Sequence, residues 1–124
     1  MKIAIKDTNV LIDLELAGLL DLWFQLGYDT YVTDLIVGEL KQGDHLKALS
    51  YVEAGMLYVE KCSSDFMMEV VNLMNEIGEG PNITDCSVLL LAMKRDAILL
   101  SGDGPLRKAA SVRQVEIHGT IWII

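Results

Sequence analysis

Short apolar segments alternate with helical patterns along most of the chain. The short segments are KIAIK at 2–6, DTYVT at 29–33, MLYVEKC at 56–62 and AILLS at 97–101. Their length is typical of strands, whereas the residues between them have the apolar spacing of helices. Parallel strands need crossover connections, and these are usually helices. The alternation predicts an α/β fold with a mainly parallel sheet that is covered by helices on both faces.

The segments between the strands carry helix start and stop signals. Gly18 is expected to divide 10–27 into two helices, and Gly27 to end the second. The segment that follows Pro81 is apolar all round from Cys86 onward, which predicts a central, buried helix. Further helices are expected over 34–43, 44–55, 63–80 and 102–112, with one or two final strands in 115–124. On the helix at 63–80, the expected core stripe is Phe66, Met67, Val70, Val71, Met74 and Ile77.

Length and composition favour one soluble domain over residues 1–124. A chain of 124 residues with 52% hydrophobic residues can bury a single core. No apolar run approaches the eighteen or so residues of a membrane span, and no secretory signal segment is evident, so we expect a cytoplasmic protein without membrane contact. Cys62 and Cys86 form no CxxC pair and lie in apolar patterns, which indicates small buried side chains.

The net charge of −8 limits any nucleic-acid role to a local surface, because proteins that contact many phosphates are normally basic. Positive residues do gather near the end of the chain. A solvated face that keeps the domain soluble would explain them equally well. These residues are Lys94, Arg95, Arg107, Lys108 and Arg113.

Two aspartates follow predicted strands. Asp7 comes directly after the first strand, and Asp103 lies just beyond AILLS in a glycine-bracketed turn. In open α/β sheets, sites form in the crevice at the carboxyl ends of the strands, where these two acids could face each other. Each alone also has an ordinary explanation, since Asp is common before helices and in glycine-rich turns.

Two more acids lie inside predicted helices. With Leu35 at 0°, Ile36 falls near about 100°, Glu39 near about 40° and Leu40 near about 140°, so Glu39 is expected within the apolar arc. A buried carboxylate must be paired, protonated or bound to a metal. Asp85 lies at the amino end of the most apolar helix, where a favourable charge near the helix dipole is the simpler explanation for that residue alone.

Taken together, the four acids predict a cation site. Carboxylates a few ångströms apart repel each other and retain protons, and a divalent ion reverses that balance. Oxygen ligands favour Mg²⁺ or Mn²⁺, whereas zinc usually recruits His and Cys. His45 and His118 have no metal-ligand spacing and are expected to be structural or surface residues.

The segments DTNVLIDL, GEL, ITDCSVLLLA and LLSGDGPLRKAA resemble the four acidic motifs of PIN domains, especially the VapC-like toxins of bacterial toxin–antitoxin pairs. The resemblance runs over nearly the whole chain. It implies a Rossmann-like α/β/α sandwich and a metal-dependent endoribonuclease. Carried over by position, the family's acidic residues are Asp7, Glu39, Asp85 and Asp103, with Asn9 and Ser101 as supporting polar residues.

The resemblance also implies roles and partners. Asp7, Asp85 and Asp103 would be metal ligands, and Glu39 could be a ligand or could position the attacking water. Arg107 and Lys108 would contact RNA phosphates. An antitoxin protein and a homodimer are the implied assemblies.

The residues bear on two other classes of function. A phosphoacceptor domain of the haloacid dehalogenase type needs a second Asp two residues after the first, and Asn9 stands there. A receiver-like domain needs an acidic pair at the end of its first strand, which Asp7 lacks. A PIN-like scaffold or protein-binding module without catalysis is the other alternative, and an intact set of four acids argues against it.

Overall fold

The strands form one parallel sheet. The computed structural model describes residues 2–5, 8–101 and 104–118. Within this part, every pair of neighbouring strands runs parallel. The strands are β1 (Lys2–Ile5), β2 (Asp29–Thr33), β3 (Leu57–Glu60), β4 (Ile98–Leu100) and β5 (Ile117–His118).

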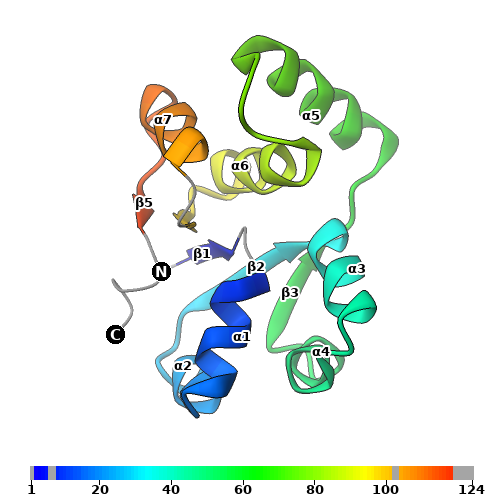
Figure 1. Cartoon of the computed structure of the whole chain (residues 1–124), viewed down its shortest axis with the longest axis vertical. Helices are drawn as coiled ribbons and strands as arrows, with labels where there is room; N and C mark the ends of the chain where they lie inside the picture. Colours follow the sequence, from blue (N-terminus) through cyan, green and yellow to red (C-terminus); the bar gives the residue numbers. More distant parts are fainter. Residues whose placement is uncertain (1, 6–7, 102–103, 119–124) are drawn as a thin grey trace.

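The strand order is β3-β2-β1-β4-β5, so the first strand of the chain is the central strand of the sheet. The chain runs from β1 outward to β3, then returns across the sheet to β4 and β5 (Figure 1). The direction of travel therefore reverses between β1 and β4, which is where ligands bind in folds of this kind. Ile5 pairs with Leu100, so the carboxyl ends of these two strands lie level with each other.

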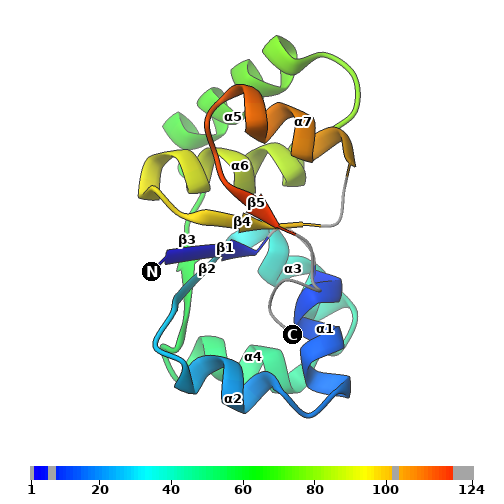
Figure 2. The same ribbon diagram turned by 90° about the vertical axis from the view of Figure 1, so that its left-hand side faces the viewer.

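Helices cover both faces of the sheet, as predicted. Figure 2 shows α1 to α4 on one side and α5 to α7 on the other, which gives a three-layer α/β/α sandwich. The first layer contains α1 (Thr8–Leu16), α2 (Leu20–Gln25), α3 (Asp34–Gln42) and α4 (Leu46–Glu53). The second contains α5 (Ser64–Ile77), α6 (Ile83–Arg95) and α7 (Gly104–Val112).

Glycines end the helices where the sequence predicts. Gly18 separates α1 from α2 with a φ of 71°, and Gly27 follows α2 with a φ of 82°. Both angles lie in the left-handed region that side chains other than glycine rarely adopt. The expected division of 10–27 into two helices is therefore confirmed.

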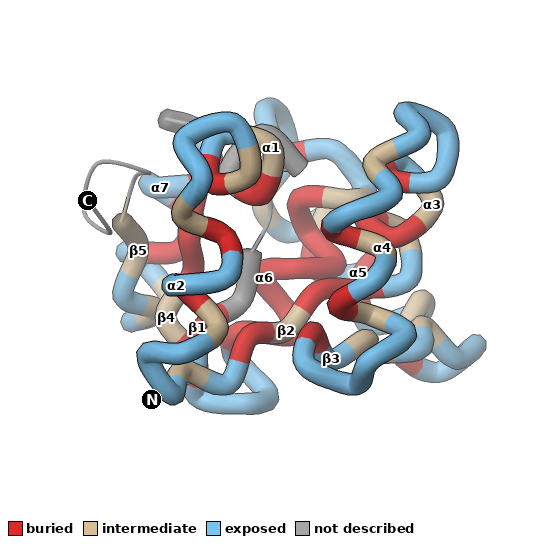
Figure 3. Tube along the Cα trace, turned by 90° about the horizontal axis from the view of Figure 1, so that it is seen from below, coloured by how far each residue is buried: buried red, intermediate tan, exposed pale blue. Residues whose placement is uncertain are grey.

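The helix α6 is the buried element that its composition predicts. Every residue from Asp85 to Ala92 is buried, whereas 93–96 are exposed (Figure 3). The helix lies against β1, β2 and β4 on one side and against α5 on the other. No helix in the described ranges combines the length and apolar character needed to cross a membrane.

The stripe predicted for α5 is partly wrong. Phe66 and Val70 are buried as expected, but Val71 is 38% exposed, whereas Leu73, which was not predicted, is 6% exposed. Met67, Met74 and Ile77 are partly buried against the core. Because α5 packs on the single helix α6, it buries the narrow i, i+4, i+7 seam of a helix pair rather than a broad face.

Cys62 follows β3 and is held beside Asp34, the first residue of α3. The Cys62 backbone N–H donates to Asp34 Oδ2 at 3.2 Å, and both cysteines are free thiols. Burial, followed by the hydrogen bond to Asp34 and its negative charge, raises the pKa of Cys62 to about 12. Cys86 is fully buried and Cys62 is half-buried, so the prediction of small buried side chains holds fully only for Cys86.

We expect Cys62 to react slowly with iodoacetamide. Only the thiolate reacts, and at pH 8 a pKa near 12 instead of the ordinary value lowers its fraction on the order of 100- to 1000-fold. Peptide-resolved mass spectrometry measures the rate in native and in urea-unfolded protein. Asp34→Asn should raise the native rate, and Asp29→Asn, at an exposed site on β2, should not. Equal rates in native and unfolded protein would contradict the shift.

Candidate active site

The candidate site lies at the carboxyl edge of the sheet, at the switch point between β1 and β4. Asp7 comes two residues after the end of β1, and Asp103 comes three residues after the end of β4. Both aspartates lie outside the described residues, so their roles stay predictions. The pairing of Ile5 with Leu100 brings the two strand ends that precede them side by side.

Asp85 is held at the amino end of α6 by a reciprocal cap. Asn82 Oδ1 accepts from the Asp85 backbone N–H at 2.8 Å, and Asp85 Oδ2 accepts from the Asn82 backbone N–H at 3.0 Å. This capping box satisfies two backbone donors that a helix start leaves open. Asp85 therefore stabilises the N-terminus of α6, which is the simpler explanation that the sequence suggested for this residue. Asp85 is also 6% exposed, which is unusual for a carboxylate.

The start of α6 is attached to the end of β2 by buried hydroxyl groups. Thr33 Oγ1 and Ser87 Oγ lie 3.2 Å apart, and both residues are fully buried. Because Thr33 is the last residue of β2, this contact places the first turns of α6 at the carboxyl edge of the sheet. Nothing in the sequence pattern had singled out either residue, although Ser87 is a polar residue within an apolar run.

Glu39 lies on α3, which begins directly after β2 at the same edge. Its expected burial is wrong, because Glu39 is exposed while its helix neighbours Ile36 and Leu40 are fully buried. A helical wheel gives the direction of a side chain around the helix but not whether another layer covers that direction. The carboxylate of Glu39 is therefore accessible to water, and the argument from enforced burial does not apply to it.

The two residues predicted to support the acids lie one position outside or inside the predicted bounds of their elements. Ser101 follows β4 directly and is fully buried, and its backbone N–H donates to the His118 carbonyl at 2.9 Å. This bond fixes the chain just before the Asp103 segment to β5. Asn9 belongs to the first turn of α1, and its side chain lies outside the described part of the structure.

Three of the five clustered basic residues are paired with glutamates. The pairs are Lys94 with Glu69 at 2.9 Å, Arg95 with Glu60 at 3.0 Å and Arg113 with Glu76 at 3.0 Å. Such pairs neutralise the positive charge locally and contribute little to stability where they are exposed. The predicted phosphate-contacting residues are the other two, which belong to α7.

Arg107 and Lys108 are exposed on α7, and within the described ranges neither forms an ion pair. The first turn of α7 is packed against the turn that leads into α6. A Cβ on Gly80, whose φ is 117°, would come within 2.9 Å of Pro105 Cβ, so this close approach requires glycine. The contact fixes the start of α7, and with it Arg107 and Lys108, relative to the start of α6.

The charge of Asp85 affects its neighbour. Burial raises the pKa of the Cys86 thiol, and the negative charge of Asp85 raises it further, partly offset by Arg113. Cys86 is thus a neutral, fully buried side chain.

Among the residues that the structure describes, no group of three or more His, Cys, Asp or Glu side chains could hold a metal ion. Two of the four predicted ligands, Asp7 and Asp103, are not in that set. The described members, Asp85 and Glu39, lie on elements that begin at the same edge of the sheet. The four-carboxylate site therefore stays a prediction.

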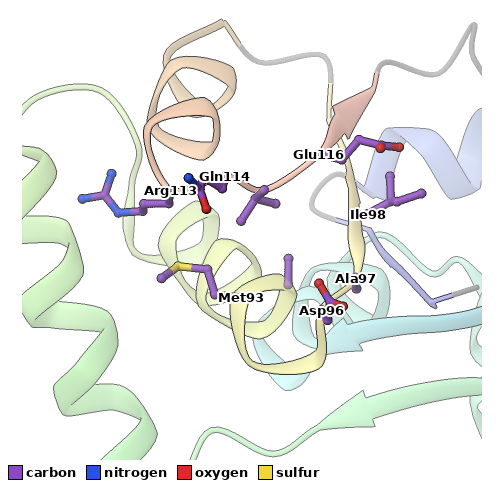
Figure 4. Close-up of a pocket in the computed structure, with 9 residues that line it drawn as sticks. Met93, Asp96, Ala97, Ile98, Arg113, Gln114 and Glu116 are labelled. Carbon is purple, nitrogen blue, oxygen red and sulfur yellow. The ribbon is translucent and has the colours of Figure 1, made fainter.

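A separate pocket of about 510 Å³ lies at the other end of α6. It is surrounded by the C-terminal end of α6, the start of β4 and residues 113–116 (Figure 4). Its polar rim includes Asp96 and Glu116. Because α6 runs from the carboxyl edge of the sheet to the amino edge, this pocket lies away from Asp85 and is not part of the candidate site.

Comparisons with known proteins agree with this architecture. The family described as a PIN domain matches residues 3–124. The structure of VapBC2 from Rickettsia felis, bound to a DNA fragment from their promoter, matches with a TM-score of 0.63 and 12% identity over 96% of this chain and 98% of that chain. FitAB bound to an IR36 DNA fragment matches with a TM-score of 0.61 and 17% identity over 97% of this chain and 95% of that chain. The comparison with curated proteins gives no match.

Proposed function

Because this chain belongs to the PIN-domain family, we propose that it is a metal-dependent endoribonuclease that hydrolyses RNA phosphodiester bonds. The observation that carries the proposal is the buried carboxylate of Asp85, held by its cap at the switch-point edge of the sheet. The strand ends that precede Asp7 and Asp103 meet at the same edge. The Asn82 backbone N–H that donates to Asp85 Oδ2 offsets part of the cost of enclosing this carboxylate, and a bound cation would offset it further.

Asp7, Asp85 and Asp103 would hold Mg²⁺ or Mn²⁺, and Glu39 would complete the site. An all-oxygen donor set suits these ions. When bound, the ion supplies Lewis acidity, which activates water and neutralises charge on the phosphate. Since Glu39 is exposed, its carboxylate can reach the water side of the crevice, either as a ligand or to orient the attacking water. Asn9 and Ser101 would support the first and last acids.

RNA would be held near the site by Arg107 and Lys108. The other three clustered basic residues are paired with glutamates, so within this cluster Arg107 and Lys108 are the ones that offer positive charge to phosphate. Few phosphate contacts imply modest general affinity and a shallow dependence on salt. Recognition would then depend on the shape of single-stranded or looped RNA at the crevice.

We further propose that the protein is the toxin of a toxin–antitoxin pair, with a cognate antitoxin as partner and a homodimer as its own assembly. The support is the motif resemblance to VapC-like toxins and the fold shared with VapBC2 and FitAB, both determined in complexes with DNA. A PIN-like scaffold without catalysis is the alternative. It predicts the same fold but no response to a divalent ion.

Addition of Mn²⁺ is expected to stabilise the protein. A ligand that binds only the folded state at 100 times its dissociation constant contributes about 2.7 kcal/mol to the free energy of unfolding. Differential scanning fluorimetry with and without millimolar Mn²⁺ measures the shift in melting temperature, and Ca²⁺ serves as a comparison ion of different size.

Cleavage is tested separately: purified protein is incubated with total cellular RNA and the cut ends are mapped. Asp103→Ala should remove the cleavage, and equal cleavage by this variant would indicate a contaminating nuclease.

A melting temperature that does not respond to Mn²⁺, together with no cleavage, would contradict the proposed function and favour the scaffold.

A further inference from the structure

Thr33 occupies the N-cap position of α3 but does not cap it. Its backbone is extended, with φ −89° and ψ 163°, as an N-cap residue should be. A threonine there usually accepts a hydrogen bond from a backbone N–H of the first helical turn. In this protein no such bond forms, and Thr33 Oγ1 instead lies 3.2 Å from Ser87 Oγ on α6.

The direction of this hydrogen bond follows from the other partner of Ser87. Ser87 Oγ donates its single proton to the Thr84 carbonyl at 2.7 Å. In its contact with Thr33, Ser87 Oγ must therefore accept, and the Thr33 hydroxyl donates. The result is a chain of two hydrogen bonds from the end of β2 to the first turn of α6, with both hydroxyl groups fully buried.

The residues on either side of this chain are the candidate catalytic acids. Ser87 and Thr84 bracket Asp85 on α6, and Thr33 immediately precedes α3, which carries Glu39. Burial makes the arrangement rigid, because a hydroxyl group that loses its partner in the interior has no water to replace it. The contact thus couples the position of the first turn of α6 to the strand from which α3 begins.

We propose that Thr33 is a positioning residue, whose hydroxyl, acting through Ser87, holds Asp85 and Glu39 in register for the shared divalent ion. The inference rests on the proposed function. Thr33 would touch neither the ion nor RNA. Its effect is on the geometry of the acids, so its loss should weaken ion binding more than it weakens the fold.

Thr33→Val removes the donor and keeps the shape of the side chain. We expect Mn²⁺ to bind about tenfold more weakly, the lower end of what supporting residues around metal sites contribute. Loss of the free-Mn²⁺ signal in electron paramagnetic resonance titrations measures the affinity without any need for RNA. Amide hydrogen exchange in the ion-free protein gives a second measurement, in which the backbone N–H groups of 85–88 should exchange faster.

Thr30→Val is a matched control on the same strand. Thr30 is also fully buried, and its hydroxyl group forms two hydrogen bonds. Trp23 Nε1 donates to Thr30 Oγ1 at 3.1 Å, and Thr30 Oγ1 donates to the Tyr28 carbonyl at 3.4 Å. That network is on the α2 side of the sheet, away from α6. We expect Thr30→Val to lower the melting temperature at least as much as Thr33→Val and to leave Mn²⁺ affinity unchanged.

Further variants test whether the hydroxyl group of Thr33 is the group that matters and whether it acts through Ser87. Thr33→Ser keeps the hydroxyl group and should bind Mn²⁺ like the wild type, whereas Ser87→Ala should match Thr33→Val. The double variant should bind Mn²⁺ no more weakly than Ser87→Ala alone, because both changes remove the same hydrogen bond between Thr33 and Ser87. Wild-type affinity in Thr33→Val, or an equal loss in Thr30→Val, would overturn the positioning role while leaving the proposed function intact. Absence of Mn²⁺ binding by the wild type would overturn both.

Discussion

Asp85→Asn is expected to reduce RNA cleavage on the order of 100-fold or more and to abolish stabilisation by Mn²⁺. Removal of a group that only supports a metal ligand already lowers affinity or activity about 10- to 100-fold, and Asp85 is proposed as a ligand itself. The substitution is mild for the fold, because the asparagine Oδ1 can still accept from the Asn82 backbone N–H and preserve the capping box. Rates of cleavage at saturating Mn²⁺ and melting temperatures with and without the ion measure the two effects.

The control places the same change in the first turn of another helix. Asp65 is exposed in the first turn of α5, as Asp85 is buried in the first turn of α6. Asp65→Asn should keep both cleavage and the response to Mn²⁺. The proposal for Asp85 fails if Asp85→Asn, with a circular dichroism spectrum like that of the wild type, cleaves RNA at the wild-type rate.

Leu89→Ala is expected to lower the free energy of unfolding by about 2.7 to 5 kcal/mol, the range found for fully buried leucines. Leu89 is 0% exposed in the middle of α6, one turn after Asp85 and on the same face of the helix. The loss is large because α6 is enclosed by the sheet and α5, so its surroundings cannot easily close over the cavity. For a protein whose total stability is about 5–15 kcal/mol, this is a considerable fraction. Urea unfolding, followed by circular dichroism, measures it.

Leu22→Ala makes the identical change at a surface position. Leu22 is 52% exposed in α2, and we expect a loss below about 1 kcal/mol. Similar urea midpoints of unfolding for Leu89→Ala and Leu22→Ala would mean that α6 is not the central element of the core.

The order and type of the elements could be predicted because each has a local signal. The segment DTYVT became β2 with the predicted bounds, and Asp34 begins α3 as predicted. The continuous apolar run after Cys86 gave the burial of α6 correctly. The parallel sheet was also predicted correctly, and it puts all carboxyl strand ends on the one side where the site is predicted.

Features that depend on contacts between layers could not be predicted. The wheel placed Glu39 between Leu35 and Ile36, but it could not tell that the side chain of Glu39 is open to water. Val71 was predicted to be buried on a broad face that α5 does not use. The hydrogen bond between Thr33 and Ser87 joins residues 54 positions apart, and neither residue shows by its own sequence surroundings that it has the other as partner.

The central place of β1 affects how this protein can be made. Ile3 pairs with Ile98, which is added to the nascent chain 95 positions later. At about 5–20 residues per second, the ribosome takes roughly 5–20 s to cover that distance, and during this time one edge of β1 has no strand beside it. Such separation in sequence also slows folding after release, since the loop must close before the pairing forms. The edge of the sheet that carries the candidate acids therefore cannot assemble until β4 has been synthesised.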